Sequence, residues 1–242
     1  TYNRHLVIDG TGFVQGGQQL GAIDSGDVWT LDHIDALSSY WDEMEYPMQP
    51  VTVPDDPAAD DEPIKGILWL TPKQMLSITT QASGRYWADM VKFAWQRKTY
   101  GTKHPLFSGE PGMWKGILIK QLPVRHIIRW LPGETTNIIT AANRLTATAS
   151  SQAVNAALTA GYAVDRALFM GAQALGYAWG KSRANNFFFE LKRRKYNFEQ
   201  SQELAGISVY GMEKLRFNFT NSAGDKEPTD HGIIVIDSAV KV

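Results

Sequence analysis

ILWLTPKQMLSI, residues 67–78, joins an apolar strand pattern directly to the start of a helix. Residues 64–70 form a short apolar run, which is typical of a buried strand. Thr71 is a helix-capping residue, Pro72 suits the first helical position, and Gln74 lies where a capping box requires it. A strand that passes at once into a capped helix predicts a fold that mixes sheet and helix.

Further elements are predicted on both sides of this segment. Apolar residues at three- and four-residue steps predict a helix over residues 30–44, with His33 and Glu43 on its solvated side in purely structural roles. A second helical pattern covers residues 85–99. Strands are predicted at residues 5–9, 64–70, 117–120, 124–130, 207–219 and 233–237, and a loop or thin surface layer at 135–160. Because strands and helices do not alternate regularly, the expected class is α+β.

The composition excludes several classes of protein. The 242 residues, of which 43% are hydrophobic, suffice for a sizeable core. The absence of cysteine excludes disulfides, thiolate zinc sites and cysteine nucleophiles. No apolar run approaches the roughly 18 residues that span a bilayer, so no membrane association is expected. A formal net charge of −1 argues against a free DNA-binding protein, which usually carries a basic excess.

No motif for catalysis or cofactor binding is present in the sequence. The five histidines are too far apart for a helical zinc motif, and no G-x-S-x-G elbow occurs. The glycine-rich loop after residue 9 has Gln15 where a dinucleotide-binding motif needs glycine, and Tyr177 follows Gly176 where a P-loop needs lysine. We therefore predict no catalytic, cofactor-binding or metal-binding residues and no cofactor. The histidines are His5, His33, His104, His126 and His231.

Two charged segments and a heavy aromatic content point to protein interfaces. Asp55–Glu62 is acidic and proline-rich but lacks the glycine turn and terminal glutamate of an EF-hand, so an exposed loop is expected. Lys192–Lys195 is a basic block, expected on a solvated face or against an acidic neighbouring subunit. Eight tryptophans, ten phenylalanines and nine tyrosines supply anchors for a core or an interface.

Six segments, in chain order, resemble the major capsid protein family of tailed bacteriophages, in particular coat proteins of short-tailed phages with a virion-packaged RNA polymerase. They are TLDHIDAL (30–37), ILWLTPKQMLSI (67–78), HPLFSGEPGMWKGILI (104–119), RALFMGAQALGYAWGK (166–181), GMEKLRF (211–217) and DHGIIVIDSA (230–239). The fourth segment is the most specific match. The acidic stretch Asp55–Glu62 resembles an insertion, and residues 192–197 are more basic than the family pattern.

The resemblance implies the tailed-phage major capsid fold, which herpesvirus capsid floors and encapsulins share. Residues 1–63, with the helix 30–44, would belong to a peripheral subdomain and residues 64–220 to an axial one. Residues 221–242 would return to the peripheral subdomain as a strand. Residues 167–170 would be an axial strand followed by a short helix after Gly171. The family's N-terminal arm and extended loop would precede Thr1.

The resemblance also implies a structural role without enzymatic activity. Such a protein self-assembles as pentamers and hexamers into an icosahedral shell around double-stranded DNA, is assembled in the host bacterial cytoplasm and resides in the virion. Decoration, scaffolding and portal proteins are the further partners expected, with only non-specific proximity to DNA. Two alternatives stay open: an encapsulin-like compartment, and an α+β small-molecule enzyme or binding domain with a distributed site.

In such a shell, the acidic and the basic segment are expected to differ in how close they lie to the packaged DNA. Packaged DNA is a dense array of phosphates, which would repel an acidic loop aimed inward. Asp55–Glu62 is therefore predicted to face outward or to meet a basic neighbour. Lys192–Lys195 is tolerated close to DNA, without contacts that read its bases.

Overall fold

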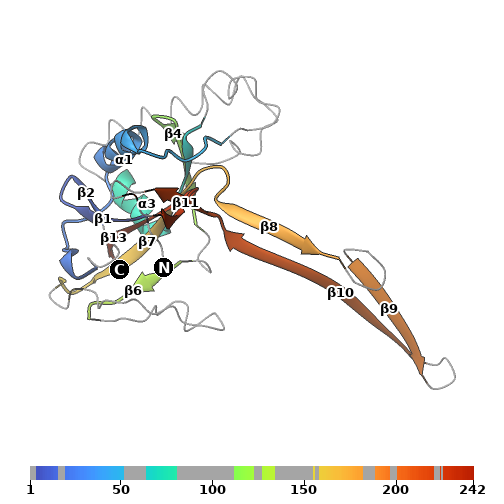
Figure 1. Ribbon diagram of the computed structural model, residues 1–242. Coiled ribbons are helices and arrows are strands. Elements are labelled where there is room, and N and C mark those ends of the chain that lie inside the picture. Colours follow the sequence, from blue (N-terminus) through green and yellow to red (C-terminus); the bar gives the residue numbers. More distant parts are fainter. Residues whose placement is uncertain are drawn as a thin grey trace, which may run out of the picture. The chain divides into compact units, whose positions relative to one another are not determined.

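The computed structural model describes residues 4–15, 20–51, 64–80, 112–122, 127–133, 155, 158–181, 189–196, 201–220, 224 and 226–242. It divides into two compact units (Figure 1). The main unit comprises Thr1–Ala174 and Arg216–Val242, and the ribbon unit comprises Leu175–Leu215. The predicted helix 85–99 and most of the predicted loop 135–160 lie outside the described residues, as does the acidic stretch Asp55–Glu62.

An eight-stranded mixed sheet forms the centre of the main unit. Its strands run in the order β2-β1-β13-β7-β3-β5-β4, and β6 pairs with β7. The pairs β1–β13 and β3–β5 are parallel, and the others are antiparallel. The strands are β1 (His5–Asp9), β2 (Gly12–Gln15), β3 (Gly66–Leu70), β4 (Gly112–Trp114), β5 (Ile117–Gln121), β6 (Arg129–Trp130), β7 (Tyr162–Met170) and β13 (Ile233–Lys241). The α+β class expected from the sequence is confirmed.

Strand β13 lies in the middle of this sheet, between β1 and β7. It pairs with β7 along its whole length, from Ile233 opposite Met170 to Lys241 opposite Tyr162. Every residue of β13 except Lys241 is buried, so burial does not alternate along the strand, which opens with the apolar run Ile233–Ile236. This burial on both faces explains why residues 233–237 could be predicted as a strand from hydrophobicity alone.

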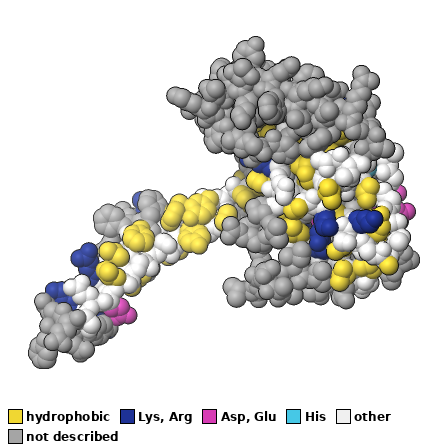
Figure 2. All heavy atoms as spheres, turned by 180° about the vertical axis from the view of Figure 1, so that it is seen from behind, with side chains coloured by type: hydrophobic (Ala, Val, Ile, Leu, Met, Phe, Trp, Pro, Cys, Tyr) yellow, Lys and Arg dark blue, Asp and Glu magenta, His cyan; other side chains and the backbone are white. Residues whose placement is uncertain are grey.

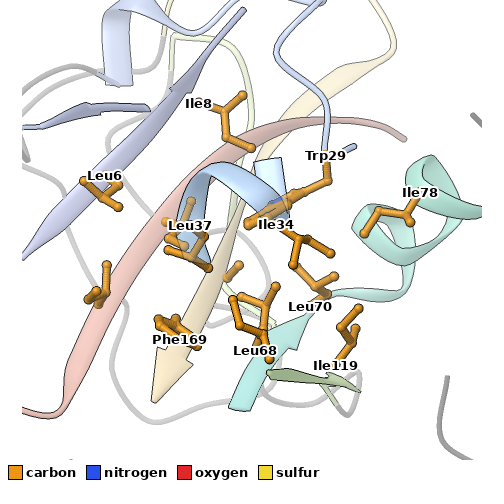
Figure 3. Close-up of a cluster of buried hydrophobic side chains, with 14 of the residues drawn as sticks. Leu6, Ile8, Trp29, Ile34, Leu37, Leu68, Leu70, Ile78, Ile119 and Phe169 are labelled. Atoms are coloured by element: carbon orange, nitrogen blue, oxygen red, sulfur yellow. The ribbon is translucent and has the colours of Figure 1, made fainter. Parts of the chain in front are cut away.

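Helices α1 (Leu31–Glu43) and α3 (Pro72–Thr79) contribute to the larger core cluster, which also contains side chains of the sheet (Figure 3). Ile34 and Leu37 of α1 are fully buried in this cluster. The ring of Trp41 meets the ring of Phe169 edge-on, with 5.7 Å between their centroids. Gly66 is needed at this point, because a Cβ there would lie 2.7 Å from the Phe169 ring. A second cluster includes Val7, Val164 and Ala239, which alternate with the strand residues of the first cluster and therefore lie on the other face.

The N-terminus of α3 forms as the sequence predicts. The backbone N–H of Gln74 donates to Thr71 Oγ1 (3.3 Å), and the Thr71 N–H donates to Gln74 Oε1 (2.9 Å). The Gln74 amide also donates to the carbonyl of Asp165 in β7 and to the hydroxyl of Ser238 in β13. The capping box therefore joins the helix to two central strands as well as starting it.

His33 corrects one expectation, because its side chain is buried and not solvated. The Thr30 N–H donates to His33 Nδ1 (3.1 Å), so Nε2 carries the proton and donates to the carbonyl of Gly10 (2.9 Å). Burial lowers the pKa of His33, which favours this neutral form. The periodicity of the helix alone places His33 on the solvent side, but the turn between β1 and β2 covers that side of α1. Glu43 is exposed, as expected.

The segment after β7 corrects a second expectation. No short helix follows Gly171; the chain continues into β8 (Leu175–Gly180). Small residues permit a close backbone approach here, and a Cβ on Gly171 would lie 2.8 Å from the carbonyl oxygen of Gln49. Large side chains then recur at every second residue, which is a strand period. The predicted strand 207–219 is divided between β10 (Ser201–Lys214) and β11 (Arg216–Thr220), and β11 pairs with β12 (Lys226–Asp230).

The three segments that the resemblance assigns to subdomains, 1–63, 64–220 and 221–242, all contribute strands to the main sheet. Their assignment to peripheral and axial subdomains stays a prediction. Of the strand predicted at 124–130, only Arg129–Trp130 is strand among the described residues, and residues 123–126 lie outside them.

Asp237 connects the three strands β1, β13 and β7 through a buried ion network. Its carboxylate accepts two hydrogen bonds from Arg166, at 2.8 and 2.7 Å, and lies 2.6 Å from His5 Nε2. Burial alone would raise the pKa of Asp237, but the charge and hydrogen bonds of Arg166, with the His5 contact, hold it below its usual value. Arg166 also lies over the Trp130 ring, 4.6 Å from its centroid.

Asp165 in β7 forms a second such centre. Its carboxylate accepts hydrogen bonds from the Arg129 guanidinium and from the Thr71 hydroxyl, which lies 2.7 Å away. Both aspartates are fully buried. Buried carboxylates with several charged and polar donors fix the positions of the neighbouring strands, because any shift would leave a charge without its partner.

Replacing Asp237 with asparagine is expected to destabilise the main unit by about 3–5 kcal/mol, because it leaves the buried Arg166 without its counter-charge. The folded-state pKa of Asp237 is depressed. Its contribution is therefore present above about pH 4, the unfolded-state pKa, and is lost as the pH falls through the lower folded-state pKa. Urea unfolding of the wild type and of Asp237→Asn from pH 3 to pH 7 measures this difference.

Asp42→Asn is the matched control, since Asp42 pairs with Lys65 but its side chain is 62% exposed. Its loss is expected to stay within about 1 kcal/mol. Equal losses in the two variants would contradict the role given to Asp237.

Candidate interaction surface

In its described residues, 175–181, 189–196 and 201–215, the ribbon unit is an antiparallel sheet without a second layer. Strand β10 spans 14 residues and pairs through Ser201–Ser208 with β9 (Phe189–Tyr196) and through Val209–Lys214 with β8. At about 3.4 Å per residue, β10 is roughly 45 Å long. Figure 1 shows β8 and β9 following one another along β10. Because successive side chains of a strand point to opposite sides, the ribbon has two faces that the register defines.

One of these faces, here called the apolar face, carries most of the large hydrophobic side chains. In the register, Trp179 lies opposite Tyr210, Tyr177 opposite Met212, and Leu191 opposite Gly206, so each pair shares this face. The large hydrophobic residues of the apolar face are Leu175, Tyr177, Trp179, Phe189, Leu191, Leu204, Tyr210 and Met212. Each of these eight side chains is between 49% and 63% exposed.

The other face is built mainly from small and charged residues near β8. Gly176, Ala178 and Gly180 alternate with the large residues of β8. A Cβ on Gly176 would lie 2.8 Å from the Leu215 side chain, and a Cβ on Gly180 would lie 2.9 Å from the Val209 side chain. Larger residues would therefore not fit at these two positions. The absence of side chains at these glycines leaves β8 with bulky groups on one side only. The ribbon is therefore strongly one-sided in this half.

Three aromatic rings form a cluster on the apolar face. The Tyr177 and Trp179 rings meet edge-on with centroids 5.1 Å apart. Tyr210 lies across the strand pair, 5.7 Å from the Tyr177 ring and 6.0 Å from the Trp179 ring. Clustered tyrosine and tryptophan side chains with exposed faces are the residues that most often dominate the binding energy of protein interfaces.

The basic block divides between the two faces. Lys192–Lys195 is exposed, as the sequence predicts, but Arg193 and Lys195 lie on the apolar face while Lys192 and Arg194 lie on the other. On that other face, Glu203 lies opposite Arg194 in the register, and Lys192 pairs with Glu190 at 3.7 Å. Among the described side chains of the apolar face there is no carboxylate. Figure 2 shows hydrophobic side chains along the ribbon and basic side chains toward its far end.

Eight large hydrophobic side chains that are about half exposed on one face make this face a candidate interaction site. A two-stranded ribbon alone is at most marginally stable in water, so contacts with a partner would also stabilise the ribbon. The sequence contained a signal for it, the two-residue spacing of Leu175, Tyr177 and Trp179. The small residues between them, Gly176 and Ala178, concealed that signal, because such residues also occur in loops and at helix ends.

The three histidines among the described residues lie in separate places. His5 joins the Asp237 network, His33 caps α1, and His231 packs against Phe217 and Phe219. His104 and His126 lie outside the described residues. In the part of the chain that the structure describes, no group of three or more histidine, aspartate or glutamate side chains is arranged to hold a metal ion. No helix in that part is long and apolar enough to cross a membrane.

Comparisons with known proteins give a consistent result. A family model described as phage capsid protein matches residues 1–242. The fold is similar to the capsid of Ralstonia phage GP4, with a TM-score of 0.56 and 16% identity over 100% of this chain and 54% of that one. It is also similar to the capsid of cyanophage Pam1, with a TM-score of 0.58 and 12% identity over 99% of this chain and 55% of that one.

The chain thus spans about half the length of the capsid chains it matches. No curated protein sequence matches it. At these identities the structural likeness establishes the fold, and the expected phage capsid fold is confirmed.

Trp179→Ser is expected to change the free energy of unfolding of the main unit by no more than about 0.5 kcal/mol, because Trp179 is half exposed and lies in the ribbon unit. Phe169→Ala, in the buried core, is expected to cost about 3–5 kcal/mol. Urea denaturation followed by far-UV circular dichroism compares the two. A loss for Trp179→Ser as large as for Phe169→Ala would mean that the apolar face belongs to the core.

Proposed function

The chain belongs to the phage capsid protein family, and from this premise we propose that it self-assembles into an icosahedral shell around double-stranded DNA. Membership of this family makes it a structural protein of the virion and not an enzyme. Its copies would form pentamers and hexamers that close the shell. A shell protein functions through contacts that symmetry repeats many times, so it needs a rigid body and exposed binding surfaces.

The observation that carries this proposal is the apolar face of the ribbon. Eight large hydrophobic side chains about half exposed in a single chain would be a liability for a protein that works as a monomer. In a shell, neighbouring subunits would cover them. The main unit supplies the rigid body, because its buried sheet is fixed by the Asp237 and Asp165 networks.

Further partners follow from the same proposal. Scaffolding and portal proteins would contact the shell during assembly, and decoration proteins would bind it afterwards. The sequence segments that resemble coat proteins of short-tailed phages with a virion-packaged RNA polymerase support placing the chain in that group. The encapsulin-like alternative differs in gene context: neighbouring terminase and portal genes favour the phage shell, and a neighbouring cargo enzyme favours the compartment.

Expression of the complete gene product in a bacterium is expected to yield closed shells by electron microscopy and a large species by sedimentation. The combined substitutions Tyr177→Ser, Trp179→Ser and Tyr210→Ser should leave folded, unassembled subunits, because they remove the aromatic cluster of the apolar face. Val209→Thr, an exposed change on the other face, is the matched control and should still assemble.

The complete protein remaining monomeric under every assembly condition would contradict the shell proposal. Shells of normal yield from the triple variant would instead exclude the apolar face as an assembly surface.

A further inference from the structure

The apolar face carries positive charge at both ends. Arg193 lies on this face opposite Leu204 of β10. Lys214 of β10 lies on it opposite Leu175. Leu204 and Lys214 are ten positions apart along β10, which corresponds to roughly 34 Å. Most of the large hydrophobic side chains of the face lie between these two cations. A partner for the face therefore needs negative charge at two places and room for bulky groups between them.

The other face of the ribbon, here called the reverse face, has this arrangement. It is formed by the odd-numbered residues of β10, from Ser201 to Glu213, and by their register partners in β8 and β9. Glu203 and Glu213 are also ten positions apart, which is the spacing of the cations on the apolar face. Between them, Gly211 lies opposite Ala178, and a Cβ on Gly211 would meet no atom within 4 Å. The reverse face is therefore open where bulky groups need room.

The connection of the ribbon to the main unit determines how two copies can bring these faces together. The ribbon joins the main unit at one end, because Leu175 follows Ala174 and Leu215 precedes Arg216. Sheets that stack face to face lie about 10 Å apart. A unit of roughly 200 residues is more than about 30 Å across, so ribbons that point in the same direction would bring two main units into one space. Ribbons that point in opposite directions keep the main units apart.

With the ribbons pointing in opposite directions, both cations of the apolar face can meet a carboxylate at once. When Arg193 of one copy lies over Glu213 of the other, the equal spacing places Lys214 over Glu203. The register partner of Glu213 is Gly176, so no basic side chain lies across the strand pair from this carboxylate. One alignment therefore satisfies the charges at the two ends of the apolar face.

The hydrophobic side chains find suitable neighbours in the same alignment. Leu191 of the apolar face lies over Gly211 and Ala178, where the reverse face is open. Tyr210 lies over Ile207, which is 43% exposed in the single chain. Large side chains thus lie over small residues or over an exposed apolar residue, so the two faces are complementary in shape as well as in charge.

A second apolar face is a poorer partner. The apolar face carries Arg193, Lys195 and Lys214, and none of its described side chains is a carboxylate. Two such faces in contact would exclude water from several cations without supplying a counter-charge, which is costly.

Single-stranded nucleic acid would satisfy only part of the apolar face. Phosphates would pair with its cations, and bases would stack on its aromatic rings. Four further side chains of the face match neither phosphates nor bases, although each is between 50% and 63% exposed: Leu175, Leu191, Leu204 and Met212. A protein surface that is both apolar and acidic accounts for all of these groups.

We propose that the apolar face of the ribbon binds the reverse face of the ribbon of a second copy, with the two ribbons pointing in opposite directions. This inference rests on the proposed self-assembly and specifies one of its contacts. The contact is heterologous, because each copy offers two different faces. The overlap from Leu204 to Lys214 is roughly 34 Å long and two strands wide, which is less than the roughly 800 Å² per partner of a standard interface. A single contact is therefore weak, and symmetry has to repeat it.

Cysteine crosslinking tests this contact, because the chain contains no cysteine. Met212→Cys marks the apolar face and Ala205→Cys marks the reverse face, and both residues are exposed. In the proposed alignment, these positions of different copies lie over each other, about 10 Å apart. The two variants of the complete protein are prepared separately, mixed under assembly conditions and treated with a short bismaleimide. The expected result is a covalent dimer that joins residues 212 and 205, identified by mass spectrometry of the linked peptides.

Gly211→Cys is the matched control, since Gly211 lies on the same face as Ala205, six residues along β10. These six residues correspond to roughly 20 Å, so mixing Gly211→Cys with Met212→Cys should give at most about a tenth of the crosslink. Equal yields from the two mixtures, or no 212–205 link between copies in assembled shells, would overturn the inference. A 212–211 link in excess of the 212–205 link would also overturn it, because the ribbons would then point in the same direction.

Charge exchange provides a second readout. Arg193→Glu places two carboxylates against each other in the proposed alignment, and Glu213→Lys places two cations against each other. Each variant should therefore raise the critical concentration for assembly by about tenfold. Mixing the two variants should lower it again, because each face then meets a complementary one. Val209→Thr, which keeps the charge and the branching of a reverse-face side chain, should assemble as the wild type does.

Glu203→Lys is the control for the alignment, because the proposed contact places Glu203 under Lys214 and not under Arg193. Mixed with Arg193→Glu, it should not restore assembly. Unchanged assembly by both Arg193→Glu and Glu213→Lys would overturn the inference. Loss of binding to a single-stranded oligonucleotide by Arg193→Glu, with no 212–205 link, would also overturn it and assign the face to nucleic acid. Wild-type protein that forms no shells would instead contradict the proposed function.

Discussion

The ion network of Asp237 is the constraint on which the main unit depends. It holds β13 between β1 and β7, so it unites the two ends of the described chain with its middle. A buried carboxylate is tolerated only where its partners are already in place. Arg166 lies directly opposite Asp237 in the β7–β13 register, and His5 reaches it from the parallel strand β1. A slip of one residue in either pairing would separate these charges and turn the apolar side chains to the wrong face.

The same pairing controls the attachment of the ribbon unit. The chain leaves the main sheet after Met170 and returns to it at Ile233, and these two residues are register partners. The excursion between them contains the ribbon, β11 and β12. Both ends of a long, exposed structure are thus fixed at one point of a rigid sheet. None of the core clusters of the described residues contains a side chain of the apolar face.

The sequence predicts correctly those elements that depend on residues close together in the chain. The start of α3 depends on Thr71, Pro72 and Gln74 within four positions, and all three act as predicted. The pairing of β1 with β13 joins residues more than 200 positions apart, and no pattern within either strand indicates it. His33 shows the same limit, because the carbonyl that buries it comes from Gly10, on another element.

The interaction surface was missed for a physical reason of a different kind. The aromatic content of the sequence indicates a core or an interface, but Leu175, Tyr177 and Trp179 alone do not distinguish between the two. Their meaning depends on the register with β10, which places Tyr210 and Met212 beside them and puts glycine and alanine on the reverse side. The same register divides the basic block: Lys192 and Arg194 share a face with Glu190 and Glu203, whereas Arg193 lies opposite Leu204. A surface in which apolar groups and cations share one face, while carboxylates are confined to the other, favours a partner that is itself apolar and acidic.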